Sequence, residues 1–397
     1  MSTWLDIVGI GEDGLAGLAP PALEALRRAE VVIGGDRHHT LAPDIAAERR
    51  CWPSPFDAMI GEIRALRGRN PVVLVTGDPL WYSVGARILR AIPASEIRFH
   101  PQLSAFQWAA CRMGWSLADC ETLTVHGRAV EQIVPHFAPR ARLLVLTQDA
   151  GTPGRVAELL KECGLGPSRM IALASLGGPN EERFEGTADG WLHDVPDFHT
   201  LAIECASEPG ARILPRTGLP DDAFEHDGQI TKRDVRAATL AKLAPFPDAV
   251  LWDIGLGCGS VAVEWMRAAR GAQAIGVEPK PARIAMARRN ATTLGAPRLR
   301  VIEGKAPDAL ANLPAPDAVF IGGGLSHETF EVAWQALRPG GSLVANAVTL
   351  EREALLIELH ALHGGELVRH AVAHAEPVGP WRGWRAAMTV TQWSAAR

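Results

Sequence analysis

The sequence predicts an α/β protein made of two consecutive parts. The chain has 397 residues, which at about 150 residues per domain is too long for one hydrophobic core. Apolar segments of strand length alternate with helical patterns in both halves, which is typical of βαβ units. A stretch without apolar periodicity separates the halves, so the same rhythm begins twice.

The alternation in the first part begins near the N-terminus. We expect strands over 4–10, 31–34 and 72–76, because these short segments contain Val, Ile and Leu. Helical spacing is found over 20–29 and 58–66, and Pro20-Pro21 suits the first turn of a helix. Strands that are joined through helices pair in parallel.

The boundary between the parts follows a strand-like segment at 201–205. Pro, Gly and Asp are frequent over 206–224, and no apolar period is visible there. We therefore predict a first domain over 1–207, a linker over 208–222 and a second domain over 223–397.

The second part repeats the strand and helix pattern. Helices are predicted over 232–243, 260–269 and 281–294. Strands are predicted over 249–254 and 273–277, so a second complete α/β unit follows the linker.

Composition and charge exclude several classes of protein. Lys+Arg total 40 and Asp+Glu 45, a formal net charge of -5, and no segment concentrates Lys and Arg, so we expect no nucleic-acid partner. The longest apolar runs, such as 72–75 and 143–146, are far too short for a membrane helix, and the first residues lack a signal-peptide pattern. The missing signal-peptide pattern leads us to expect a cytoplasmic protein. The six cysteines form no metal-binding pair, so we expect no metal site.

A glycine-rich turn follows the first predicted strand. Gly9-Ile10-Gly11-Glu12-Asp13-Gly14 formally matches GxGxxG, and Asp36 is interpreted as the end of the next strand. The turn is a dinucleotide site, a structural turn or a loop that lines a small-molecule cleft. The last interpretation is favoured, because the next helix begins only at Pro20-Pro21, too late for its amides to hold a pyrophosphate.

A second glycine-rich turn lies in the C-terminal part. The segment 253–260 contains Gly255, Gly257 and Gly259 and leads directly into the helix over 260–269. Glu278 follows the next predicted strand, where a carboxylate can accept hydrogen bonds from ribose hydroxyls. Both NAD and S-adenosylmethionine fit this geometry.

Further motifs favour S-adenosylmethionine. A turn over 303–307 and a strand over 317–321 that runs into Gly322-Gly323-Gly324 complete a pattern that resembles class I S-adenosylmethionine-dependent methyltransferases. The segments 218–224 and 228–236 resemble the start of the C-terminal methyltransferase module of cobalamin biosynthesis.

The first part resembles a different family. Gly9-Ile10-Gly11, the run 34–38, the run 76–85 and the run 123–128 are similar to motifs of the tetrapyrrole methylase family, in the same order. This resemblance implies an N-terminal region of two α/β lobes around a cleft, followed by a doubly wound, Rossmann-like methyltransferase domain.

The resemblance also implies the reaction. The N-terminal module would methylate carbon 5 of a reduced tetrapyrrole, and the C-terminal module would methylate carbon 15 and decarboxylate the acetate on carbon 12. Two S-adenosylmethionine sites per chain follow, and relatives of both modules tend to form homo-oligomers. A tetrapyrrole methyltransferase acting at other ring positions, a nicotinamide-dependent oxidoreductase and a non-catalytic tetrapyrrole carrier remain as alternatives.

Site residues are implied by the same match. In the C-terminal module the positions that contact S-adenosylmethionine are Thr231, Gly255, Leu256, Gly257, Cys258, Gly259, Glu278 and Ala306. In the N-terminal module Gly77, Pro79, Ser104, Ala105, Leu176 and Gly177 match the cofactor cleft, while Gly9 and Gly11 would floor the tetrapyrrole cleft. Relatives usually carry a small residue in place of Leu256 and Asp in place of Lys305, so we expect altered packing and a lost contact at these two positions.

Four groups of residues are candidates for the chemistry. Asp78 is a polar group for the N-terminal reaction centre or a turn cap before Pro79. His327 is a proton donor for decarboxylation or an exposed residue at a helix start. Gly322 and Gly323 leave room for a flat macrocycle, and Arg382 and Arg385 bind its carboxylates or are solvated.

Overall fold

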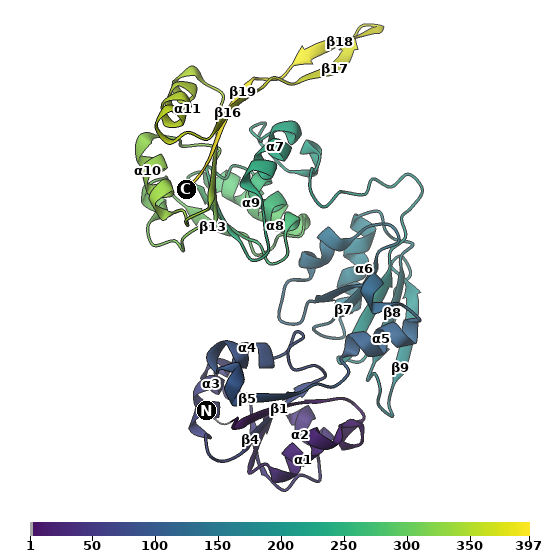
Figure 1. Ribbon diagram of the computed structural model, residues 1–397. Coiled ribbons are helices and arrows are strands. Elements are labelled where there is room, and N and C mark those ends of the chain that lie inside the picture. Colours follow the sequence, from purple (N-terminus) through teal and green to yellow (C-terminus); the bar gives the residue numbers. More distant parts are fainter. Residues whose placement is uncertain (1–2) are drawn as a thin grey trace. The chain divides into compact units, whose positions relative to one another are not determined.

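A computed structural model describes residues 3–397 and divides the chain into two units (Figure 1). The first unit comprises residues up to 130 together with 137–212, and the second comprises 131–136 together with 213–397. No helix in the described part of the chain is long and apolar enough to cross a membrane.

The first lobe of the N-terminal unit is a parallel sheet between two layers of helices. Its strands lie in the spatial order β3 (Glu48–Cys51), β2 (Val31–Gly34), β4 (Pro71–Thr76), β1 (Leu5–Ile10) and β5 (Ile97–His100). The accompanying helices are α1 (Pro20–Arg28), α2 (Asp36–Leu41), α3 (Met59–Ala65) and α4 (Gly85–Ala91). Side chains alternate between the faces of β4, so Val73 packs with Ile63 of α3 and Leu74 packs with Leu26 of α1.

The second lobe is a mixed sheet. Its strands lie in the order β6 (Glu121–Thr124), β7 (Arg142–Leu146), β10 (His199–Glu204), β8 (Arg169–Ala174) and β9 (Glu182–Thr187). Only the β6–β7 pair is parallel. The helices are α5 (Ala105–Met113) and α6 (Thr152–Glu162), and α5 buries Phe106 against Leu144 and Leu173 of the sheet.

The C-terminal unit is a doubly wound sheet of seven strands. The order is β13 (Arg300–Glu303), β12 (Gln273–Glu278), β11 (Val250–Ile254), β14 (Ala318–Ile321), β15 (Ser342–Ala347), β19 (Val390–Ala396) and β16 (Glu366–His370). The first five strands are parallel, and β19 is antiparallel to both of its neighbours. This architecture confirms the predicted fold class.

Helices cover both faces of this sheet. One face carries α7 (Arg233–Leu243), α8 (Ser260–Ala268) and α9 (Pro281–Thr293), and its core includes Leu251 and Phe320. The other face carries α10 (His327–Ala336) and α11 (Leu350–His363), and its core includes Trp252 and Val319. The period-2 alternation along β11 and β14 therefore fills two separate cores.

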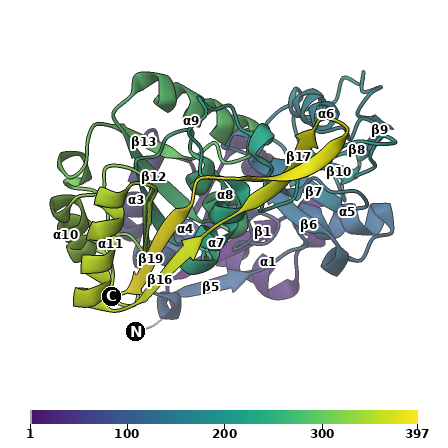
Figure 2. The same cartoon turned by 90° about the horizontal axis from the view of Figure 1, so that it is seen from above.

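A two-stranded hairpin extends from the C-terminal sheet. It consists of β17 (Ala373–Val378) and β18 (Trp381–Ala386) and projects from β16 and β19 in both views (Figures 1 and 2). Ala347 at the carboxyl end of β15 pairs with Thr391 at the start of β19, so the hairpin leaves the sheet at the edge where the parallel strands end.

Two details differ from the sequence-based expectations. Asp36 does not end a strand: β2 ends at Gly34, and Asp36 is the first residue of α2. The segment predicted as a linker is not free throughout, because Leu219 is fully buried and packs with Val263 and Ala291 in the C-terminal unit.

Candidate active sites

The turn between β11 and α8 is shaped by three glycines in left-handed conformations. Gly255, Gly257 and Gly259 have φ of 76°, 57° and 81°. A Cβ at Gly255 would lie 2.6 Å from the backbone of Gly323, so this position must be glycine if the two loops are to meet. The turn and the Gly322–Gly324 loop therefore lie together at the carboxyl edge of the sheet, where open α/β sheets bind ligands.

Glu278 holds this turn from the neighbouring strand. One carboxylate oxygen accepts the Gly257 N–H at 2.9 Å and the other accepts the Lys280 N–H at 3.1 Å. The side chain is buried, yet each oxygen keeps a further lone pair for a ligand hydroxyl. Its main-chain oxygen accepts the Gly304 N–H at 3.2 Å, which brings the turn containing Ala306 beside it.

Leu256 and Cys258 lie within the glycine turn. Both are buried, and the Leu256 side chain belongs to the core between the sheet and α7. A Cβ at Gly276 would lie 2.5 Å from Leu256 Cδ1, so the bulk of Leu256 is accommodated by a glycine on β12. Leu256 therefore packs into this core, and Lys305 is exposed on the turn after β13.

Asp253 is a buried ionisable group near the glycine turn that the sequence motifs do not single out. It is buried at the end of β11, where Oδ2 accepts the Ala262 N–H at 3.0 Å and Oδ1 has no hydrogen-bond partner among residues 3–397. Burial raises the pKa of this carboxyl group to about 8, and the charge of Glu278 adds to the effect. Its position just before the glycine turn is the sequence feature that could have indicated that Asp253 lies near the site.

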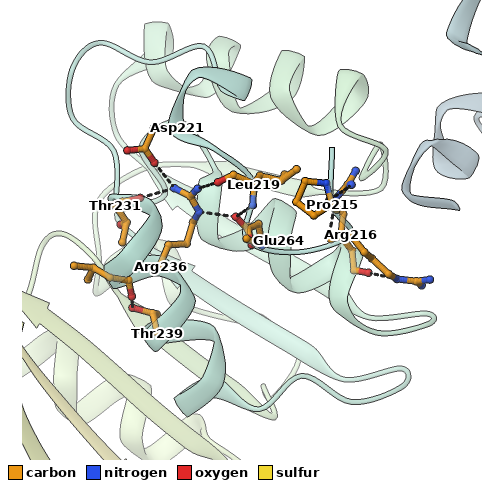
Figure 3. Close-up of polar contacts among 12 residues, drawn as sticks. Pro215, Arg216, Leu219, Asp221, Thr231, Arg236, Thr239 and Glu264 are labelled. Atoms are coloured by element: carbon orange, nitrogen blue, oxygen red, sulfur yellow. Dashed lines mark hydrogen bonds and ion pairs between the residues drawn. The ribbon is translucent and has the colours of Figure 1, made fainter. Parts of the chain in front are cut away.

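Thr231 is positioned by a buried ion cluster (Figure 3). Arg236 on α7 is completely buried and donates to Glu264 on α8 at 2.7 Å, to Asp221 at 3.1 Å and to the Thr231 carbonyl oxygen at 2.5 Å. Glu264 also accepts the N–H groups of Gly218 and Leu219, at 2.6 and 3.0 Å.

This cluster fastens the segment 218–231 to the helices that flank the glycine turn. Sequence reasoning missed Arg236, because an arginine in a helix with polar neighbours is normally solvated.

The remaining C-terminal candidates lie on exposed elements. His327 is the first residue of α10 and lies 3.4 Å from the Glu358 carboxylate. Arg382 and Arg385 lie on β18, where Arg385 pairs with Glu376 across the hairpin at 3.0 Å. Trp381 and Trp384 on the same strand are 78% and 80% exposed, so the hairpin presents aromatic and cationic side chains to solvent.

The N-terminal turn is built differently. A Cβ at Gly9 would overlap the Gly77 carbonyl oxygen, and a Cβ at Gly11 would lie 2.7 Å from Asp13 Oδ1. Gly77, with φ of 62°, comes close to Ser104, because a Cβ there would lie 2.9 Å from Ser104 Cα. Three loops, which follow β1, β4 and β5, therefore converge at the carboxyl edge of the first lobe.

Asp78 serves as a turn cap. Its Oδ1 accepts the N–H groups of Leu80 and Trp81, at 2.7 and 3.1 Å. Pro79 is buried beneath Gly85, whose Cβ would overlap the Pro79 carbonyl oxygen. The loop that matches the cofactor cleft is thus rigidly held.

Helix α5 connects this loop with the second lobe. Ser104 caps α5 by accepting the Phe106 N–H at 3.3 Å, and Ala105 begins the helix. One turn further on, Trp108 packs against Gly177, where a Cβ would lie 2.9 Å from the indole ring. Leu176 is buried in the core beneath α5, so the candidates from both lobes are gathered around the start of one helix.

Two family models divide the chain between them. The model described as tetrapyrrole (corrin/porphyrin) methylases matches residues 5–190, and the model described as precorrin methyltransferase domain matches residues 222–397. The class defined by fold and sites is therefore a double methyltransferase, with a tetrapyrrole methylase module ahead of a Rossmann-like module.

A full-length relative specifies the family. A Sinorhizobium protein named precorrin-6Y C(5,15)-methyltransferase [decarboxylating] is 49% identical over 99% of this chain and 96% of its own length. The chain belongs to the family of precorrin-6Y C(5,15)-methyltransferases (decarboxylating).

Two shorter relatives match less than half of the chain. A Salmonella typhimurium protein named cobalt-precorrin-7 C(5)-methyltransferase is 31% identical over 45% of this chain and 87% of its own length. A Saccharolobus solfataricus protein named probable cobalt-precorrin-6B C(15)-methyltransferase (decarboxylating) is 34% identical over 35% of this chain and 72% of its own length.

Proposed function

We propose that the chain transfers methyl groups from S-adenosylmethionine to carbons 5 and 15 of a reduced tetrapyrrole, precorrin-6B, and decarboxylates the acetate on carbon 12 to give precorrin-8. The match to a relative of that name over 99% of the chain carries this proposal. The two shorter relatives, one named for each ring position, support separate assignments: carbon 5 to the N-terminal unit, carbon 15 and decarboxylation to the C-terminal unit.

Each unit has its own donor site in this proposal. In the C-terminal unit the backbone of 255–259 accommodates S-adenosylmethionine, Glu278 accepts the ribose hydroxyls, and Thr231 and Ala306 flank the site. In the N-terminal unit the site lies along Gly77 and Pro79, the start of α5 at Ser104 and Ala105, and the turn at Leu176 and Gly177. The backbone of Gly9 and Gly11 floors the tetrapyrrole cleft.

The geometry fits a reaction that needs alignment more than a strong base. S-adenosylmethionine supplies a methyl group on a positively charged sulfur, and the bridging carbons of a reduced tetrapyrrole are already nucleophilic. In each unit a fixed loop, at Gly77 in the first and at Gly255 in the second, holds the donor of that unit in line with its acceptor carbon. Methyl transfer by in-line displacement requires this alignment. Asp78, held within its turn, lines the N-terminal reaction centre.

Decarboxylation requires an oriented carboxylate, and it requires a proton for the carbon from which carbon dioxide leaves. Gly322 and Gly323 leave space for a flat macrocycle beside the C-terminal donor site. Arg382 and Arg385, on the hairpin beyond the same edge of the sheet, bind carboxylate arms. His327 is the proposed proton donor.

We also propose that the chain forms a homo-oligomer, which the family resemblance implies. The exposed Trp381 and Trp384 give the hairpin an apolar surface that association would cover. Light scattering on the eluted full-length protein measures this state, and a monomer at all concentrations contradicts it.

A mass-spectrometric assay tests the reaction. Full-length protein with S-adenosylmethionine and precorrin-6B should give a product with two added methyl groups and one carboxyl group fewer. A tetrapyrrole recovered with unchanged mass, together with binding of NADH and no binding of S-adenosylhomocysteine, supports an oxidoreductase instead.

A further inference from the structure

Three polar residues, Thr76, Arg37 and His38, form a hydrogen-bonded group at the carboxyl edge of the first lobe. Thr76 is the exposed last residue of β4 and directly precedes Gly77 of the donor loop. Arg37 and His38 lie in the first turn of α2, which follows the neighbouring strand β2. Both of their side chains reach the Thr76 hydroxyl.

The hydrogen bonds fix the protonation of His38. The Gly35 N–H points at Nδ1 of His38 at 3.0 Å, and since a backbone N–H can only donate, Nδ1 carries no proton. Nε2 therefore carries the hydrogen and donates to Thr76 Oγ1 at 3.0 Å. Burial and the charge of Arg37 lower the pKa of His38 to about 4, so this neutral tautomer persists at neutral pH.

Arg37 supplies a second donor to the same oxygen. Its Nη1 lies 3.1 Å from Thr76 Oγ1. The guanidinium is held by an ion pair with Glu12 and lies over the Phe198 ring, 3.7 Å from its centroid. These three contacts leave the arginine little freedom to turn away from Thr76.

The Thr76 hydroxyl can therefore still donate one hydrogen bond. A threonine oxygen has two lone pairs, and Arg37 and His38 occupy both. The hydroxyl proton has no acceptor in the part of the chain that the structure describes, residues 3–397. Because the residue is exposed at the edge that carries the donor loop, this proton is available to a bound molecule.

We propose that the Thr76 hydroxyl, oriented by Arg37 and His38, donates a hydrogen bond to a carboxylate of a small molecule bound in the N-terminal site. The proposal rests on the proposed function, in which two bound molecules carry carboxylates: the tetrapyrrole through its side chains and the methyl donor through its methionine part. Thr76 is then a binding residue, and Arg37 and His38 are positioning residues.

Two substitutions in the full chain separate the hydroxyl from the shape of the side chain. Thr76→Val keeps the shape and removes the hydroxyl, whereas Thr76→Ser keeps the hydroxyl. Thr292→Val, which removes an exposed hydroxyl from α9 in the other unit, is the control. The readouts are KM and kcat for carbon 5 methylation of the tetrapyrrole, and the Kd of S-adenosylhomocysteine by calorimetry.

In Thr76→Val we expect a rise of roughly tenfold either in KM for the tetrapyrrole or in the Kd of S-adenosylhomocysteine, the size expected for one hydrogen bond to a charged group. The kcat and carbon 15 methylation should be unchanged. A raised KM for the tetrapyrrole assigns the carboxylate to the substrate, and a raised Kd for S-adenosylhomocysteine assigns it to the donor. Thr76→Ser should stay within about twofold of the wild type.

Unchanged KM and Kd in Thr76→Val overturn the proposal, as does an equal loss in Thr76→Ser. A wild-type chain that methylates no tetrapyrrole refutes the proposed function instead, and the calorimetric arm then still tests the hydroxyl.

Discussion

Each unit has a glycine-rich turn at the end of its first strand, and the two turns share a G-x-G step but differ in construction. In the C-terminal unit, α8 begins directly after Gly259, and the turn rests on Gly323 and Glu278. In the N-terminal unit, α1 begins only at Pro20, and the start of a different helix, α5, lies beside the loop at Gly77. A G-x-G step after a strand therefore permits a close backbone approach in both units, but it does not determine which helix faces the ligand.

The ion cluster around Arg236 belongs to the C-terminal turn alone and gives the largest expected effect. Arg236→Met leaves Glu264 buried without its ion-pair partner, and breaking such a pair destabilises by about 3–5 kcal/mol. Calorimetry should show a lower unfolding temperature for the C-terminal unit, while carbon 5 methylation persists.

An exposed pair provides the control for Arg236→Met. Arg289 and Glu225 are 57% and 52% exposed, so Arg289→Met should change the unfolding temperature little. Equal effects of the two substitutions would show that the Arg236 cluster does not hold the segment 218–231.

Alanine at each close glycine should disable one site and spare the other. Gly255→Ala forces the turn away from Gly323 and should lower carbon 15 methylation and decarboxylation by about 100-fold, because displacements of about 1 Å have effects of that size. Gly9→Ala forces β1 away from Gly77 and should lower carbon 5 methylation to a similar extent. Mass spectrometry of the products measures both.

Glycines without close neighbours are the matched controls. Gly340 also has a left-handed φ, 79°, but a Cβ there meets nothing within 4 Å, and the same is true of Gly61 in α3. Gly340→Ala and Gly61→Ala should retain both methylations. Loss of both activities in Gly255→Ala or in Gly9→Ala would contradict independent sites.

The buried carboxyl group of Asp253 makes the C-terminal unit sensitive to pH. Its pKa is about 8 in the folded chain and near 4 when unfolded, so between these values only the folded state holds the proton. The stability that this proton gives is complete below pH of about 4 and is lost as the pH rises through about 8.

Asparagine at this position should remove that pH dependence. Asp253→Asn keeps an oxygen for the Ala262 N–H and does not ionise. Between pH of about 5 and 9, the unfolding temperature of the wild type should fall further than that of the variant, because a group that is protonated only in the folded state costs about 1.4 kcal/mol of stability per pH unit between its two pKa values. Parallel pH profiles would show that Asp253 does not titrate in this window.

The hairpin carries the smallest expected effect. Arg382→Ala should raise KM for the carbon 15 step a few-fold, because one exposed guanidinium contributes modestly to binding a carboxylate. Steady-state kinetics of the full chain measure it. A similar rise for carbon 5 methylation would place Arg382 outside the C-terminal site.

Local sequence patterns predicted most of the fold. The core strands and helices were predicted to within a few residues, because each has a clear apolar period and Pro20 and Pro281 begin their helices. The structure differs at Asp36, which does not end β2 but begins α2 two residues after the strand.

Contacts between residues that are distant in the sequence could not be predicted from it. The burial of Arg236 depends on Glu264, 28 positions away, and the space for Leu256 depends on Gly276 of the next strand. The bonds of Thr76 to Arg37 and His38 also join separate elements, strand β4 and helix α2. No periodicity within one segment reports such pairs.

If each unit has its own donor site, as we propose, each should bind its own molecule of methyl donor. Isothermal titration of the full-length chain with S-adenosylhomocysteine tests it most directly. We expect two molecules bound per chain, with one lost in Gly255→Ala and the other in Gly9→Ala. A single molecule bound to the wild-type chain would contradict it.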